Sequence, residues 1–256
     1  MVARVRCWIA TGAVLAAALL TLPQAAAADQ RSWFSRAVPM RLMALGDSLS
    51  NADLARLLDA GGYRFAIVGR SRGRASRDYV IRSFSPDPAP QLYGVVTRAA
   101  IERYDPDVIL LMAGTNDLLR VAERKPGYTL SNVVEGMNAL LAEIFYLRPH
   151  ANVIVAGAVD GPRLLACDVV DFDGIDDENG CGKSARPSLT TLVAAYAARD
   201  FHVVLAGGMS IAVPRDKAHF PDGVHPSGRG SSQALARVWM DAIAHETTDD
   251  TLAAGR

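Results

Sequence analysis

The sequence predicts an α/β protein in which a parallel sheet lies between two layers of helices. Short apolar runs that end at a glycine alternate with segments whose apolar residues recur at helical spacing. The chain is 50% hydrophobic and 21% charged, which is typical of a globular protein. Regular alternation of strand and helix indicates parallel strands joined by right-handed helical crossovers.

The expected elements follow each other along the whole mature chain. We expect strands at 41–45, 65–68, 107–113, 152–156 and 202–205, and helices between 49 and 60 and at 133–147, 189–198 and 231–244. The run at 107–113 is apolar almost throughout, which is typical of a strand that is buried on both faces. Because ligands of such folds bind beyond the carboxyl ends of the strands, the functional residues are expected where the strands end.

The first 28 residues are predicted to be a secretory signal peptide. Two arginines precede a largely apolar run at 7–22, and small residues at 25–28 offer a cleavage site after Ala28, or after Ala27 as the alternative. An uncleaved anchor is the other interpretation, but the run is short of the about 20 residues that cross a bilayer. We therefore expect a secreted protein, extracellular or periplasmic, that is not held at a membrane.

The mature chain is expected to form one domain. An N-terminal extension at 29–38 precedes a domain at 39–246, and a tail follows at 247–256. Lys and Arg total 27 and Asp and Glu total 27, so the overall charge does not favour nucleic-acid binding. We expect a monomer.

Two cysteines remain after removal of the signal peptide. Cys167 and Cys181 are expected to form a disulfide, because a protein that has crossed a membrane meets an oxidising environment. Two free thiols in one loop are the alternative.

Three short motifs carry the residues that point to chemistry. Ser48, in GDSL at 46–49, stands where a strand turns into a helix, as an N-cap or as a nucleophile at the positive end of a helix dipole. Asn116, in GTND at 114–117, is a turn former or an amide donor to an oxyanion. Asp222 and His225, in DGVHP at 222–226, have the spacing with which a carboxylate orients a general base.

These motifs, in this order, resemble those of the SGNH hydrolases, also called the GDSL esterase/lipase family. The resemblance covers about 41–244 and implies a flavodoxin-like three-layer α/β/α sandwich with a five-stranded parallel sheet, so that 39–246 would be an SGNH hydrolase domain. It implies that Ser48 is the nucleophile, His225 the base and Asp222 the residue that orients His225. Asn116 and the N–H of Ser48 would hold the oxyanion. We expect His219 to be a loop residue without the Asp-x-x-His spacing.

The family also uses a glycine N–H as an oxyanion donor. By context this glycine is expected to be Gly94, with Gly73 as the runner-up. Within the family, the sequence looks most like acetylxylan-esterase-type members in the segments 65–71 and 106–108. Those members also carry a glycine-rich stretch before the third strand, and this chain has a different sequence there, at 78–82. A small-molecule or carbohydrate ester is thus the expected substrate, and a short acyl chain is favoured because no long apolar lid segment is present.

Two segments of the sequence carry charges that are almost all of one sign. Residues 64–82 contain six arginines and one acid, whereas 168–178 contain six acids and no base. Each is interpreted as a solvated loop; the alternatives are that the two segments form opposite walls of a cleft or pair with each other. The acidic segment lacks the EF-hand spacing, so no metal is predicted, and the acyl-transfer mechanism needs no cofactor. The remaining alternatives are a lipid esterase, a thioesterase, an acyltransferase, or an inactive binding protein on the same fold.

Overall fold

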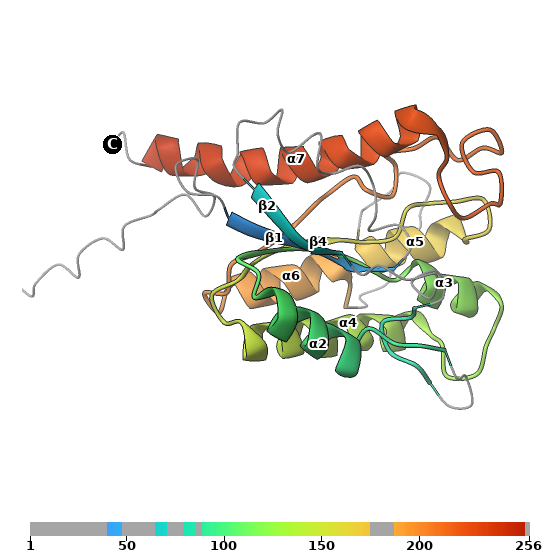
Figure 1. Ribbon diagram of the computed structural model, residues 1–256. Helices are drawn as coiled ribbons and strands as arrows, with labels where there is room; N and C mark the ends of the chain where they lie inside the picture. Colours follow the sequence, from blue (N-terminus) through green and yellow to red (C-terminus); the bar gives the residue numbers. More distant parts are fainter. Residues whose placement is uncertain (1–39, 48–64, 71–78, 85–88, 175–186, 254–256) are drawn as a thin grey trace, which may run out of the picture. The chain divides into compact units, whose positions relative to one another are not determined.

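A parallel sheet with helices on both of its faces forms the described part of the protein (Figure 1). The computed structural model describes residues 40–47, 65–70, 79–84, 89–174 and 187–253, all within the compact unit Ser32–Arg256. The predicted signal peptide, the extension at 29–38 and the helix expected between 49 and 60 lie outside the described residues.

The sheet has five parallel strands in the order β2-β1-β3-β4-β5, which confirms the predicted flavodoxin-like fold. The strands are β1 (Met40–Gly46), β2 (Phe65–Arg70), β3 (Val108–Met112), β4 (Asn152–Ala156) and β5 (Val203–Leu205). β1 and β3 are neighbours, so the segments that follow them, with the GDSL and GTND motifs, leave the sheet side by side. This strand order therefore sets the place of the functional site.

Alternate residues of the strands enter two hydrophobic cores, one on each face of the sheet. One core contains Met43, Leu45, Ile109, Leu111, Val153, Val155 and Val203. The other contains Leu42, Val108, Leu110, Met112, Ile154 and Ala156. Nearly all of these side chains are fully buried, as expected of strands covered on both faces.

Helices from different parts of the chain cover the two faces (Figure 1). On one face lie α2 (Val95–Tyr104), α4 (Leu130–Leu147) and α6 (Leu189–Ala197), and on the other lies α7 (Gly228–Ala253). α7 continues well beyond the expected end at 244 and through most of the predicted tail, because no glycine or proline interrupts 231–254. Two short helices, α3 (Thr115–Ala122) and α5 (Ala166–Asp173), were not expected from the sequence.

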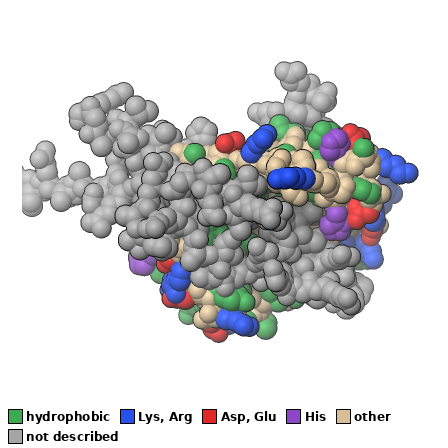
Figure 2. All heavy atoms as spheres, turned by 45° about the horizontal axis from the view of Figure 1, so that its top comes forward, with side chains coloured by type: hydrophobic (Ala, Val, Ile, Leu, Met, Phe, Trp, Pro, Cys, Tyr) green, Lys and Arg blue, Asp and Glu red, His purple; other side chains and the backbone are tan. Residues whose placement is uncertain are grey.

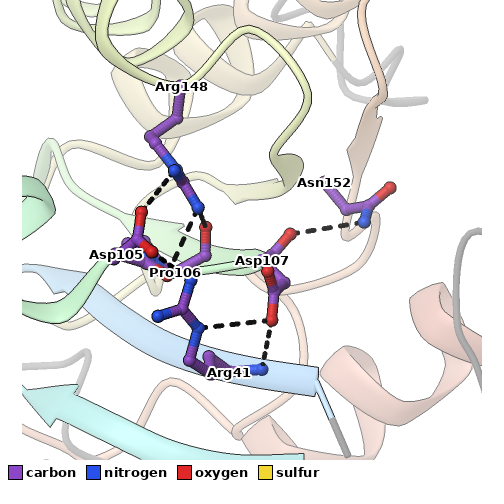
Figure 3. Close-up of polar contacts among 6 residues, drawn as sticks. All are labelled: Arg41, Asp105, Pro106, Asp107, Arg148 and Asn152. Carbon is purple, nitrogen blue, oxygen red and sulfur yellow. Dashed lines mark hydrogen bonds and ion pairs between the residues drawn. The ribbon is translucent and has the colours of Figure 1, made fainter. Parts of the chain in front are cut away.

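An ion-pair network ties together the amino-terminal ends of the central strands (Figure 3). Arg41 on β1 pairs with Asp105 and Asp107 just before β3, and Arg148 after α4 also pairs with Asp105. The N–H of Asn152, at the start of β4, donates to the carbonyl of Asp107 at 2.9 Å. The hydrogen bond from Arg41, helped by the charge of Arg148, lowers the pKa of Asp105 below its ordinary value. The network thus joins three strands at the edge opposite the strand ends that carry the motifs.

Asp105→Asn is expected to lower the melting temperature at neutral pH. Because the pKa of Asp105 is lower in the folded state, its contribution is present above the unfolded-state pKa of about 4 and is lost as the pH falls through the folded-state value. The difference between the wild type and the variant should therefore shrink below about pH 4. Melting curves from pH 2 to 8 measure this. Glu123→Gln, which breaks one surface pair with Arg163 at 3.3 Å, is the control and should shift the melting temperature less. A pH-independent difference would contradict the ionic role of Asp105.

Candidate active site

The end of β1 is pressed directly against the end of β3. Gly46 has a φ of 152°, and a Cβ there would lie 1.8 Å from the carbonyl oxygen of Met112, so only glycine fits. The N–H of the next residue, Asp47, donates to the same carbonyl at 3.1 Å. Asp47 is fully buried, and Ser48 follows it just outside the described residues. The chain thus enters Ser48 from a rigid junction at the carboxyl edge of the sheet.

Asn116 stands in the first turn of α3, which begins directly after β3. Gly114 caps the helix with a φ of 121°, and a Cβ there would lie 2.9 Å from the ring of Phe172 on α5. Asn116 is 7% exposed, and its Nδ2 donates to the carbonyl of Tyr79 at 2.7 Å. An amide nitrogen carries two hydrogens, so one N–H of Asn116 remains for another acceptor.

Asp222 and His225 form a hydrogen-bonded pair in the turn before α7. Oδ2 of Asp222 lies 2.6 Å from Nδ1 of His225, and Oδ1 accepts the backbone N–H groups of His225 at 2.7 Å and Val224 at 2.9 Å. Partial burial opposes ionisation, but these hydrogen bonds outweigh it and lower the pKa of Asp222 to about 2. An ionised carboxylate can only accept a hydrogen bond, so Nδ1 of His225 carries a proton in this contact, and in the neutral ring Nε2 is the nitrogen that can accept a proton.

The loop after β4 holds this turn at the carboxyl edge of the sheet. The N–H of Arg163 donates to the carbonyl of Gly223 at 3.0 Å. Gly161 packs so closely that a Cβ there would lie 2.7 Å from the same oxygen. α3 and the loop that precedes α7 accordingly lie at the same end of the sheet (Figure 1). Asp47, Asn116 and the Asp222–His225 pair therefore belong to elements that meet at one edge.

A second pair of the same kind lies in the same loop. His219 Nδ1 is 2.8 Å from Oδ1 of Asp216, which also accepts the backbone N–H of His219 at 2.9 Å. Figure 2 shows histidine side chains beside acidic ones at one end of the described surface. The expectation that His219 lacks the Asp-x-x-His spacing is wrong, because Asp216 stands three residues before it. This spacing was readable from the sequence.

Residues 44–232 match the model of the GDSL-like Lipase/Acylhydrolase family. The chain belongs to this family. It is therefore an SGNH-type enzyme that acts on ester bonds, as predicted. A search of curated proteins found no match.

Solved structures show the same fold. The chain is similar to the Clostridium thermocellum family 3 carbohydrate esterase, with 20% identity, a TM-score of 0.53, and coverage of 81% of this chain and 96% of that one. A family 3 carbohydrate esterase from Talaromyces cellulolyticus matches with 17% identity and a TM-score of 0.54, over 82% and 99%. An acetyl esterase mutant with an acetate ion matches with 17% identity and a TM-score of 0.51, over 82% and 99%.

The glycine expected to complete the oxyanion hole of this GDSL-like enzyme makes a different contact. The N–H of Gly94 donates to Oε2 of the buried Glu143 on α4 at 2.7 Å. An N–H that is bound to a carboxylate is not free to hold an oxyanion, which speaks against the assignment of Gly94. The runner-up, Gly73, lies outside the described residues.

The acidic segment of the GDSL-like enzyme is not simply a solvated loop. Residues 166–173 form α5, and Asp173 is 4% exposed at the end of that helix. Burial raises the pKa of Asp173 to about 7, and the charge of Asp160 adds to the rise, while a hydrogen bond from Ser210 opposes it. Cys167 on α5 is disulfide-bonded. Its expected partner, Cys181, lies outside the described residues, so the pairing of these two remains a prediction.

The described part of the GDSL-like enzyme contains no group of three or more His, Cys, Asp or Glu side chains arranged to bind a metal ion. The arginine-rich segment at 64–82 falls largely outside the described residues. Among the described helices, none combines the length and the apolar character that crossing a membrane requires.

Proposed function

We propose that the chain is a secreted serine esterase that removes short acyl groups, with an acetylated carbohydrate as its natural substrate. The observation that carries this proposal is the Asp222–His225 pair, held by the loop after β4 at the sheet edge from which the chain enters Ser48. Three similar structures, two carbohydrate esterases and an acetyl esterase, support the substrate class.

The mechanism follows from the chemistry of these residues. The hydroxyl of Ser48 attacks the ester carbonyl while Nε2 of His225 takes its proton. The negative charge that develops on the carbonyl oxygen is stabilised by the free N–H of Asn116 and by the backbone N–H of Ser48. His225 returns the proton to the leaving alcohol and then activates water, which releases the acid from the acyl-enzyme.

Covalent trapping tests the proposed nucleophile directly. A fluorophosphonate should add to one residue of the mature enzyme, and peptide mapping should place it on Ser48. Ser48→Ala should take up no label. A wild type that neither labels nor hydrolyses p-nitrophenyl acetate would favour the inactive binding protein.

A substrate panel tests the acyl and alcohol preferences. p-Nitrophenyl esters of increasing acyl length should be hydrolysed fastest as the acetate. Acetylated sugars should be hydrolysed faster than acylglycerols or acyl-thioesters of matched concentration. Faster hydrolysis of long-chain acylglycerols would show instead that the protein is a lipid esterase.

Asn116→Ala is expected to lower kcat by about 10² to 10³, or roughly 3–4 kcal/mol, with KM nearly unchanged. The amide is held in place before reaction by Tyr79 and by the first turn of α3, so its effect falls on the transition state. Loss of the bond to Tyr79 also costs about 1 kcal/mol of stability. The kcat of the folded, titrated enzyme and the melting temperature separate the two effects. A destabilised but fully active variant would remove Asn116 from the oxyanion hole.

The secreted enzyme is expected to contain a Cys167–Cys181 disulfide. Cys167 is disulfide-bonded and lies on α5, whose ring of Phe172 packs against Gly114. A closed loop of about 15 residues stabilises the fold by about 3 kcal/mol in the chain-entropy model. Peptide mapping without reductant should recover one cross-linked peptide. Alkylation of both thiols in freshly secreted protein would show that they are free.

A further inference from the structure

Two adjacent side chains at the start of α3 make hydrogen bonds to one distant segment, residues 79–81. Nδ2 of Asn116 donates to the carbonyl of Tyr79 at 2.7 Å, and Oδ2 of Asp117 accepts the N–H of Ile81 at 2.9 Å. Between these two contacts, the N–H of Val80 donates to the carbonyl of Pro90 at 3.0 Å. Segment 79–81 is thus hydrogen-bonded to α3 through Tyr79 and Ile81, and to Pro90 before α2 through Val80.

The carboxyl group of Asp117 is sealed from solvent. Asp117 is 1% exposed, and its Oδ1 has no hydrogen-bond partner among the described residues. Burial raises the pKa of Asp117 to about 8, and the charge of the equally buried Asp47 adds to the rise. The N–H of Ile81 and the charge of Arg120 oppose the rise without cancelling it. At neutral pH the carboxyl group is therefore mostly protonated.

We propose that Asp117 is a positioning residue for Asn116: its carboxyl group fixes Ile81 against the first turn of α3, and this segment holds the Asn116 amide through the carbonyl of Tyr79. The inference rests on the proposed function, in which Asn116 donates to the oxyanion. The uncharged form suits this place, because a carboxylate next to Asn116 would repel the negative charge of the transition state. Asp117 touches neither substrate nor oxyanion in this role and acts only through its neighbour.

A pair of substitutions separates positioning from simple structural support. Asp117→Ala removes the acceptor of the Ile81 N–H and should lower kcat for p-nitrophenyl acetate by about 10- to 100-fold, with KM nearly unchanged. Asp117→Asn offers a neutral amide oxygen to the same N–H and should keep kcat within about threefold of the wild type. Amide hydrogen exchange should show Ile81 protected in the wild type and in Asp117→Asn, and exposed in Asp117→Ala.

Glu143→Ala is the matched control, because Glu143 is also a buried carboxyl group that accepts one backbone N–H, that of Gly94. It should lower the melting temperature and leave kcat of the folded enzyme within about twofold. A loss of kcat in Glu143→Ala equal to that in Asp117→Ala would show that any buried carboxyl of this region matters equally, and would overturn the specific role of Asp117.

The pH profile provides a readout that structural support alone would not move. Ionisation of Asp117 above about pH 8 should lower kcat of the wild type, and Asp117→Asn should lack this alkaline decline. Identical alkaline limbs, a fully active Asp117→Ala, or a protected Ile81 in that variant would each overturn the inference. A wild type that hydrolyses no ester would instead refute the proposed function, so the two failures are distinguishable.

Discussion

His225→Ala is expected to lower kcat for p-nitrophenyl acetate by roughly 10⁶, the loss typical of removing the base of a Ser-His pair. In the proposed mechanism His225 takes the proton of the Ser48 hydroxyl, and without the imidazole the hydroxyl keeps its proton and is a poor nucleophile. The melting temperature should change little, because His225 is partly exposed and its turn keeps the bond between Gly223 and Arg163. Kinetics with a burst phase to count active sites measure the effect.

The chain offers a matched control in His219. It makes the same Nδ1 contact to an aspartate three residues earlier, at 2.8 Å against 2.6 Å for His225, in the same loop. His219→Ala should keep kcat within about twofold, since a surface substitution outside the reacting groups has a small effect. If His219→Ala were the inactive variant and His225→Ala the active one, the base would belong to the other pair.

Asp222→Asn is expected to lower kcat by about 10⁴ while leaving KM and the fold nearly unchanged. The amide would donate toward Nδ1 and favour the tautomer that carries its proton on Nε2, which cannot accept the proton of Ser48. Asp216→Asn is the matched control and should retain activity. A near-wild-type kcat in Asp222→Asn would show that another acceptor orients His225.

The pH dependence of Asp222→Asn distinguishes a catalytic from a stabilising role. With the pKa of Asp222 at about 2, its carboxylate remains ionised across the working range and can accept the Nδ1 proton of His225 throughout it. The folded-state pKa of Asp222 lies below the unfolded-state value. Any stability that Asp222 supplies is therefore present above about pH 4 and is lost as the pH falls toward about 2. A kcat loss that persists at pH 7 in fully folded protein is therefore catalytic.

Much of the fold was predictable because its signals are local. The apolar runs that became β1, β3 and β4 end at glycines, and the prediction of β4 matches its observed bounds, Asn152–Ala156. The expectation that functional residues lie where the parallel strands end agrees with the structure, in which Asp47 directly follows β1 and the GTND motif comes shortly after β3. The pairing of Asp216 with His219 is equally local, because Asp216 stands only three residues before His219 in the sequence.

Only the tertiary structure decided the states and partners of the buried polar groups. The N–H of Gly94 donates to the carboxyl group of Glu143, which lies 49 positions further along the chain. The carboxyl group of Asp117 accepts the N–H of Ile81, which lies 36 positions earlier. Neither contact leaves a pattern in the local sequence. Burial by distant segments raises the pKa of Asp117 to about 8, whereas hydrogen bonds from its own turn lower the pKa of Asp222 to about 2. The sequence by itself thus determined the candidate catalytic residues and the local Asp222–His225 pair, whereas burial by distant segments decided the pKa and the partners of a carboxyl group such as that of Asp117.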